Sequence, residues 1–90
     1  MGSHAGPGLT DDVANRLRKA LVAVFRRAPA ELSLDLRLGH IAGWDSMTAV
    51  SFSFELEDAF DVVLGETTFA ADQTIADVLA VLRERGAQSV

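Results

Sequence analysis

Residues 43–60, GWDSMTAVSFSFELEDAF, contain the strongest structural signal in this sequence. A glycine-containing loop ends here, and apolar residues at helical spacing follow Asp45 and Ser46. Asp and Ser are both good helix N-caps. The pattern therefore predicts a helix that begins at Asp45 or Ser46 and runs to about Asp61.

Two lines of mainly apolar residues run along this predicted helix. The line expected to face the core comprises Ala49, Phe52, Ser53, Leu56 and Phe60. The second line starts beside Ser46 and comprises Met47, Val50 and Phe54. A domain of 90 residues is too small to bury both lines fully, so we expect the second one to be exposed.

A long helix is predicted before this stretch. Thr10 is a suitable N-cap, and apolar residues recur after it at three- and four-residue spacing. Arg26 and Arg27 are expected in the last turn, and Pro29 is expected to stop the helix.

The C-terminal third of the sequence predicts one short and one long helix. The short helix is expected within residues 66–71, around Phe69. Thr74 and Asp77 resemble a capping box with Asp in place of Glu, and the apolar positions that follow predict a helix that stops near Gly86.

Residues 30–44 contain leucines that alternate with polar residues, a pattern that superficially indicates a strand. No second convincing strand exists to pair with it, so we expect a long ordered loop pinned to the core by its leucines. The predicted fold is an all-α four-helix bundle of three longer helices and one short helix. The expected domain spans residues 9–86, with a tag or disordered lead-in at 1–8 and a disordered tail at 87–90.

Composition excludes several classes of function. The chain has no cysteine, so disulfides and thiolate metal sites are excluded. The net charge is -5, and from residue 28 to residue 72 nine acidic residues accompany a single basic one, Arg37. Such a segment repels nucleic acid and attracts basic protein partners. Apolar runs are far shorter than the roughly 20 residues that span a bilayer, so we expect a soluble, cytoplasmic protein without a membrane role. We also expect a monomer without a metal site.

The chain resembles acyl carrier proteins. Asp45-Ser46-Met47 is similar to the family's Asp-Ser-Leu attachment site, and residues 55–60 are similar to its acidic Leu-Glu-Glu-x-Phe stretch. The resemblance implies that Ser46 bears a 4'-phosphopantetheine arm, derived from coenzyme A, whose thiol holds acyl cargo as a thioester. It also implies that Asp45 helps to hold metal-bound coenzyme A in the modifying transferase. A simple N-cap role for Asp45 is equally compatible with the sequence.

The resemblance implies a non-catalytic carrier with several enzyme partners. These are a phosphopantetheinyl transferase and acyl-loading, ketosynthase, transferase or condensation enzymes of fatty-acid-like, polyketide or mixed polyketide–peptide biosynthesis. Glu55 and Asp58 border the line of Met47, Val50 and Phe54, and an apolar line with a charged rim is typical of a transient docking surface.

Three alternatives remain open at this point. The first is an aminoacyl or peptidyl carrier, although such carriers usually have a less acidic recognition helix than the predicted helix at residues 45–61. A small helical interaction domain would use Asp45 and Ser46 only as caps. A Ser–His hydrolase with His40 is disfavoured, because no Gly-x-Ser-x-Gly elbow surrounds Ser46. Trp44 departs from the small or aliphatic residue common before the family's Asp-Ser.

Overall fold

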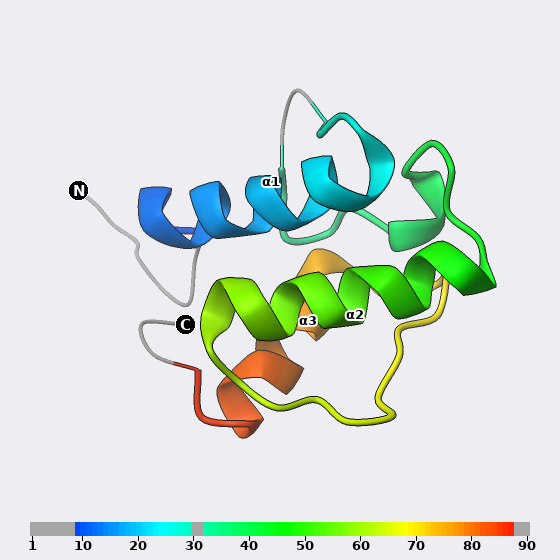
Figure 1. The fold of residues 1–90 in the computed structure, drawn as a ribbon. Helices are drawn as coiled ribbons and strands as arrows, with labels where there is room; N and C mark the ends of the chain where they lie inside the picture. Colours follow the sequence, from blue (N-terminus) through cyan, green and yellow to red (C-terminus); the bar gives the residue numbers. More distant parts are fainter. Residues whose placement is uncertain (1–8, 30–31, 88–90) are drawn as a thin grey trace.

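The computed structural model describes residues 9–29 and 32–87. Within these residues the protein is all-α, as predicted, and the nearest approach to a sheet is an isolated bridge between Arg37 and Thr74. In chain order the elements are α1 (Asp11–Phe25), the 3-10 turn η1 (Leu38–His40), α2 (Ser46–Phe60) and α3 (Ile75–Glu84), as Figure 1 shows. No helix in this described part of the chain is long and apolar enough to cross a membrane.

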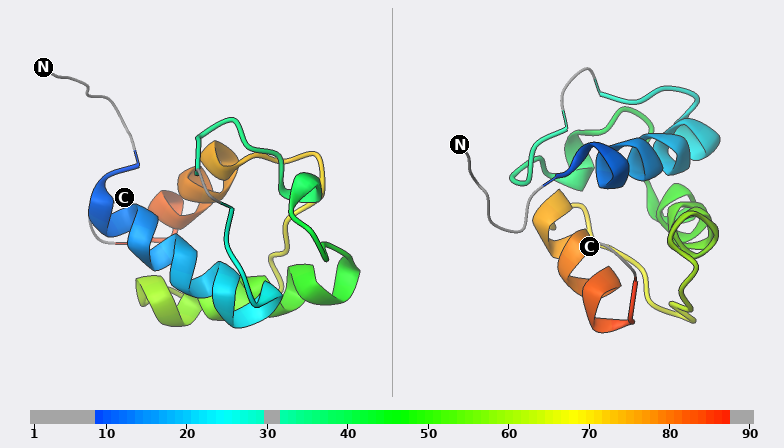
Figure 2. Two further views of the ribbon diagram at one scale, coloured as in Figure 1. Left: turned by 90° about the horizontal axis from the view of Figure 1, so that it is seen from above. Right: turned by 90° about the vertical axis from the view of Figure 1, so that its left-hand side faces the viewer.

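Helices α1 and α2 lie side by side and run in opposite directions (Figures 1 and 2). The shorter α3 closes the third side of the core, as the right-hand view of Figure 2 shows. This arrangement brings the C-terminal end of α1 close to the loop that precedes α2. The first turn of α2 therefore begins at one end of the bundle.

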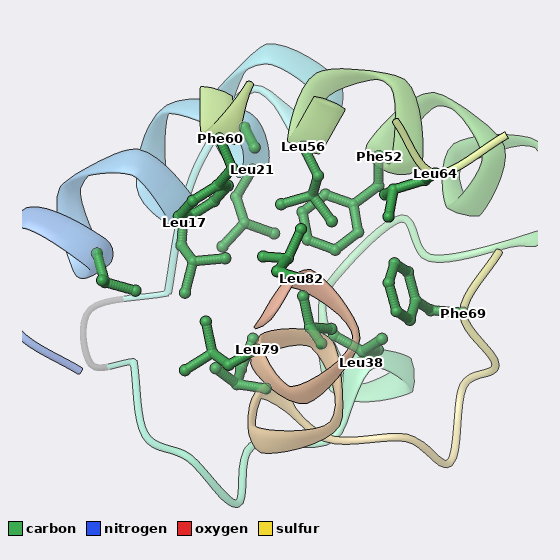
Figure 3. Close-up of a cluster of buried hydrophobic side chains, with 14 of the residues drawn as sticks. Leu17, Leu21, Leu38, Phe52, Leu56, Phe60, Leu64, Phe69, Leu79 and Leu82 are labelled. Carbon is green, nitrogen blue, oxygen red and sulfur yellow. The ribbon is translucent and has the colours of Figure 1, made fainter. Parts of the chain in front are cut away.

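The core is filled by aliphatic and aromatic side chains from all three helices and from the loops (Figure 3). The predicted core line of α2 is confirmed, because Ala49, Phe52, Ser53, Leu56 and Phe60 are all buried. Full burial of each large apolar side chain contributes about 1.5–3 kcal/mol, so these contacts dominate the stability of the fold.

The two ends of α1 differ in how well the sequence predicts them. Thr10 is the N-cap, as predicted, and its Oγ1 accepts a hydrogen bond from the Val13 N–H at 3.2 Å. The helix ends earlier than expected, because Arg26 adopts a left-handed backbone (φ 70°) and its N–H bonds the Val22 carbonyl. The expectation that Arg26 and Arg27 form the last turn is therefore wrong, since both follow the helix.

The short helix expected within residues 66–71 is also misplaced. That segment consists of turns and irregular chain, and the short helical element is η1, in the first long loop. The physical reason is long-range bonding of the backbone. The Leu38 N–H donates to the Gln73 carbonyl at 2.9 Å, and the Gly39 N–H donates to the Ala71 carbonyl at 2.8 Å. Within the segment, the Ala70 N–H donates to Gln73 Oε1 at 2.7 Å, whereas a helix over residues 66–71 would require it to donate to the Glu66 carbonyl.

The long first loop is ordered and pinned by its leucines, as predicted. Leu38 is fully buried, and Leu32, Leu34 and Leu36 pack partly against the core. The loop also completes α3, because the Leu36 and Leu34 carbonyls accept hydrogen bonds from the N–H groups of Ile75 (3.0 Å) and Ala76 (2.8 Å). Free N–H groups at a helix start need such partners.

The predicted capping box of α3 is confirmed. The Asp77 N–H donates to Thr74 Oγ1 at 3.3 Å, and the Thr74 N–H donates to the Asp77 carboxylate at 2.9 Å. The lead-in expected at residues 1–8 and the tail residues 88–90 lie outside the described residues. Ala87 packs partly against the core, and its N–H bonds the Leu82 carbonyl at 3.0 Å.

Candidate functional site

Ser46 is the first residue of α2, and its side chain is exposed. Within residues 9–29 and 32–87, no hydrogen bond engages its hydroxyl. The N-terminus of a helix presents unpaired N–H groups and partial positive charge, which favour a negatively charged substituent such as a phosphodiester. The Ser46 hydroxyl is thus accessible and unpaired, at a position that suits an attached phosphate.

Asp45 caps the helix and fixes the residue before this serine. Its Oδ1 accepts a hydrogen bond from the Thr48 N–H at 2.8 Å, and its own N–H donates to Thr48 Oγ1 at 2.8 Å. The hydrogen bond from the Thr48 N–H lowers the pKa of Asp45. Desolvation raises this pKa, and the hydrogen bonds from the Thr48 hydroxyl and the Met47 N–H lower it by smaller amounts. Asp45 therefore stays ionised near neutral pH and keeps the cap closed.

The Thr48 hydroxyl ties the helix to the preceding loop. It accepts from the Asp45 N–H and donates to the Gly43 carbonyl at 3.0 Å. Gly43 adopts φ 93°, a left-handed conformation that residues other than glycine rarely adopt. Gly43 thus permits a tight turn, and Thr48 holds that turn against the first turn of α2.

Aromatic rings anchor the same junction to the rest of the fold. Trp44 stacks on Phe25, at the end of α1, with 5.9 Å between ring centroids. It also meets the edge of the buried Phe52 ring at 5.9 Å. Phe52 in turn packs against Phe69 at 6.3 Å, and Figure 3 shows both rings within the core. Trp44 thus links the loop before Ser46 to α1 and to the centre of the molecule.

The second apolar line of α2 is exposed, as expected. Met47, Val50 and Phe54 have 78%, 41% and 58% of their surface exposed. Asp58 is exposed, whereas Glu55 is half-buried and lines a surface groove of about 610 Å³ between α2 and α1. Arg16 and Lys19 of α1, together with Asp58 and Asp61, also line this groove.

Glu57 has a structural contact that the sequence did not reveal. Its carboxylate accepts hydrogen bonds from the N–H groups of Leu64 (2.6 Å) and Gly65 (3.0 Å). The carboxylate thus holds the segment after α2 against the helix. In the sequence Glu57 looks like one more acidic residue, and only the glycine that follows it by eight positions hints at a turn it could bind.

The serines in the described part of the chain differ in accessibility. Ser33 Oγ bonds the Asp35 carboxylate at 2.8 Å, and Ser53 is buried with its Oγ on the Ala49 carbonyl at 3.2 Å. Ser51 is exposed but lies within α2, past its first turn. Ser46 alone among these four combines an exposed side chain with a place at a helix start. His40 is exposed at the end of η1, and among the described residues no group of three potential metal ligands occurs.

Comparison with known families identifies the class of protein. Residues 15–82 match the family model described as "Phosphopantetheine attachment site". Because the match covers most of the chain, the protein belongs to this family of phosphopantetheine-binding carrier domains. Its members are non-catalytic carriers with covalent 4'-phosphopantetheine, modified by a phosphopantetheinyl transferase and used by client enzymes. Searches of curated proteins and of solved structures each returned no match.

Proposed function

We propose that this chain is an acyl carrier protein whose 4'-phosphopantetheine arm is attached to Ser46. The observation that carries the proposal is the exposed Ser46 hydroxyl at the start of α2, which has no hydrogen-bond partner among residues 9–29 and 32–87 and lies next to the capping carboxylate of Asp45. When bound, the arm supplies a terminal thiol that holds acyl cargo as a thioester. The other serines in the described residues are bonded, buried or within a helix, so they fit the arm less well.

The attachment step requires little of the carrier itself. The Ser46 oxygen attacks the phosphorus of coenzyme A that bears the pantetheine group. A new P–O bond to Ser46 forms, the P–O bond to adenosine 3',5'-bisphosphate breaks, and the serine proton passes to a base of the transferase. The carrier contributes an accessible hydroxyl in a fixed place. The partial positive charge of the α2 N-terminus then favours the phosphodiester that results.

An intact-mass experiment tests this attachment. The purified chain is incubated with coenzyme A, Mg²⁺ and a broad-specificity phosphopantetheinyl transferase. We expect one phosphopantetheine addition to the wild type, one to the control Ser51→Ala and none to Ser46→Ala. Ser51 is the matched control because it is an exposed serine on the same helix. Modification of Ser46→Ala would place the arm elsewhere and overturn the assignment.

The proposal extends to a partner surface on α2, which comprises Met47, Val50, Phe54, Glu55 and Asp58. Its support is the exposure of the apolar line beside Ser46 and the acidic residues next to it. An enzyme that docks here meets the arm where it leaves the carrier. Such a rim of charge steers basic partners more than it adds affinity.

Charge reversal tests the surface. Glu55→Lys with Asp58→Lys should slow modification by a transferase with a basic docking face about threefold to tenfold, and added salt should slow the wild type in the same direction. Glu66→Lys with Asp72→Lys, the same charge change in the segment after α2, should leave the rate nearly unchanged. Equal effects of the two double variants would mean that net charge, and not this surface, controls docking.

Acyl cargo is favoured by the acidic character of α2 and its C-cap. Four acids occur between residues 55 and 61 and no base does, whereas aminoacyl and peptidyl carriers usually have a less acidic recognition helix. The alternative is an aminoacyl or peptidyl carrier. Loading the modified chain with an acyl-loading enzyme and with an amino-acid-activating enzyme distinguishes the two. We further propose that the carrier domain spans residues 9–86 and acts in the cytoplasm. Its pathway is fatty-acid-like, polyketide or mixed polyketide–peptide biosynthesis, and its clients are ketosynthase or condensation enzymes.

A further inference from the structure

The loop residue before the Asp45 cap is held by a helix that is distant in sequence. Trp44 stacks on Phe25, the last residue of α1, with an interplanar angle of 20° and 5.9 Å between centroids. Phe25 also lies 6.4 Å from the Phe52 ring, so the three rings form one cluster. We call Phe25, Trp44 and Phe52 the aromatic clamp. The clamp fixes the loop to both α1 and α2 one residue before Asp45.

The backbone around the clamp transmits this position to Ser46. Gly43 reverses the chain with φ 93°, and a Cβ built on it would lie 3.4 Å from the Phe25 ring. Thr48 Oγ1 bonds Gly43 and Asp45 on the other side. The short backbone segment that contains Ser46 is thus held on one side by the Trp44 stack and on the other by the Thr48 hydrogen bonds. The clamp therefore sets where the backbone of Ser46 lies.

We propose that Trp44 is a positioning residue for the modification at Ser46, acting through its stack on Phe25 at the end of α1. This inference rests on the proposed attachment of the arm to Ser46. Trp44 is half-buried against the core, in contrast to the exposed Met47 of the docking line. Its role is therefore to hold the attacking oxygen in line with coenzyme A in the docked complex. Small errors in such placement reduce rates strongly, since about 1 Å can cost up to a hundredfold.

Steady-state kinetics of modification separate positioning from docking. Trp44→Ala should lower kcat by roughly tenfold or more with little change in KM, because the docking line stays intact. Phe25→Ala should show the same pattern from α1, and the double variant should lose no more than the larger single loss, because both changes open one clamp. Trp44→Phe should retain most of the wild-type kcat, because a phenyl ring can still stack on Phe25.

Two controls exclude a general loss of stability. Leu79→Ala removes a buried side chain from α3, away from the junction, and should leave kcat and KM unchanged at temperatures where the variant is folded. Trp44 is the single tryptophan, so its fluorescence reports the clamp directly. In Phe25→Ala the emission should shift to longer wavelength as the indole loses its cover, while circular dichroism should show the helices intact.

The opposite results are equally clear. If Trp44→Ala and Trp44→Phe both raise KM and Phe25→Ala changes neither kcat nor KM, the indole contacts the transferase itself and does not position Ser46. If Trp44→Ala and Leu79→Ala reduce kcat equally, the clamp contributes only to stability. Either result overturns the inference and leaves the attachment at Ser46 standing, since Ser46→Ala tests that attachment separately.

Discussion

The polar bonds at the first turn of α2 join residues of that turn to each other, whereas the contacts at its last turn come from α1 and from the segment that follows the helix. Asp45 and Thr48 bond each other across three positions. At the other end the Arg16 guanidinium of α1 lies 5.7 Å from the centre of the Phe60 ring, and Glu57 bonds the chain seven and eight residues ahead. The start of α2 therefore exposes the Ser46 hydroxyl beside a cap whose hydrogen bonds lie within one turn. The far end stabilises the fold.

The largest contrast is expected between a core residue and the candidate attachment residue. Leu56 is fully buried, so Leu56→Ala should lower the free energy of unfolding by about 2–5 kcal/mol. Ser46→Ala should change it by about 0.5 kcal/mol or less, because Asp45 and not Ser46 provides the cap. Urea unfolding of both variants measures the difference. Equal losses would make Ser46 a structural residue.

The next contrast lies between two neighbouring acids. Glu57→Ala leaves the Leu64 and Gly65 N–H groups without their carboxylate partner, so we expect a loss of about 1–3 kcal/mol. Asp58→Ala, at the exposed position next to it, should cost about 0.5 kcal/mol or less. The same urea series decides this. Similar values for both would show that the Glu57 bonds do not hold the segment after α2.

A smaller effect is expected where α1 ends. Arg26 has φ 70°, a conformation that glycine adopts without steric strain, so Arg26→Gly should stabilise the protein by about 0.5–1 kcal/mol. Arg27 is the matched control because it is not among the residues with positive φ, and Arg27→Gly should be neutral or destabilising. Thermal melts give the sign of each change. Destabilisation by Arg26→Gly would mean that the arginine side chain makes a contact worth more than the backbone strain.

The smallest expected effect is the pH dependence of the Asp45 cap. Its pKa is lowered in the folded state, first of all by the Thr48 N–H. The ionised cap therefore contributes its stability above the unfolded pKa of about 3.9 and loses it as pH falls through the lower folded value. The stability difference between the wild type and Asp45→Asn should be constant near neutral pH and should change below about pH 4. A difference that changes between about pH 5 and 7 would assign the dependence to another group.

The sequence predicts those features of the structure that depend on residues a few positions apart, and it misses those that depend on residues distant in the sequence. Thr10, Asp45 and Thr74 were identified as caps because a cap bonds an N–H three positions away. The early end of α1 and the short turn at η1 were missed, because a left-handed arginine and bonds from η1 to residues 71–73 set them.

The candidate site divides in the same way. The exposed line of Met47, Val50 and Phe54 follows from helical spacing. Asp45 and Ser46 are predicted at the helix start by their capping chemistry, and the attachment role of Ser46 is implied by the resemblance to acyl carrier proteins. The stack of Trp44 on Phe25 does not, because it joins residues on two elements whose approach only the fold determines.

Peptide mapping of the modified wild-type chain tests the central claim most directly. After treatment with coenzyme A and the transferase, the chain is digested and its peptides are fragmented in a mass spectrometer. We predict that the phosphopantetheine mass is found on the peptide that contains Ser46, with fragment ions that place it on Ser46 and leave Ser51 and Ser53 unmodified. Fragment ions that place the mass on any other residue would contradict the account.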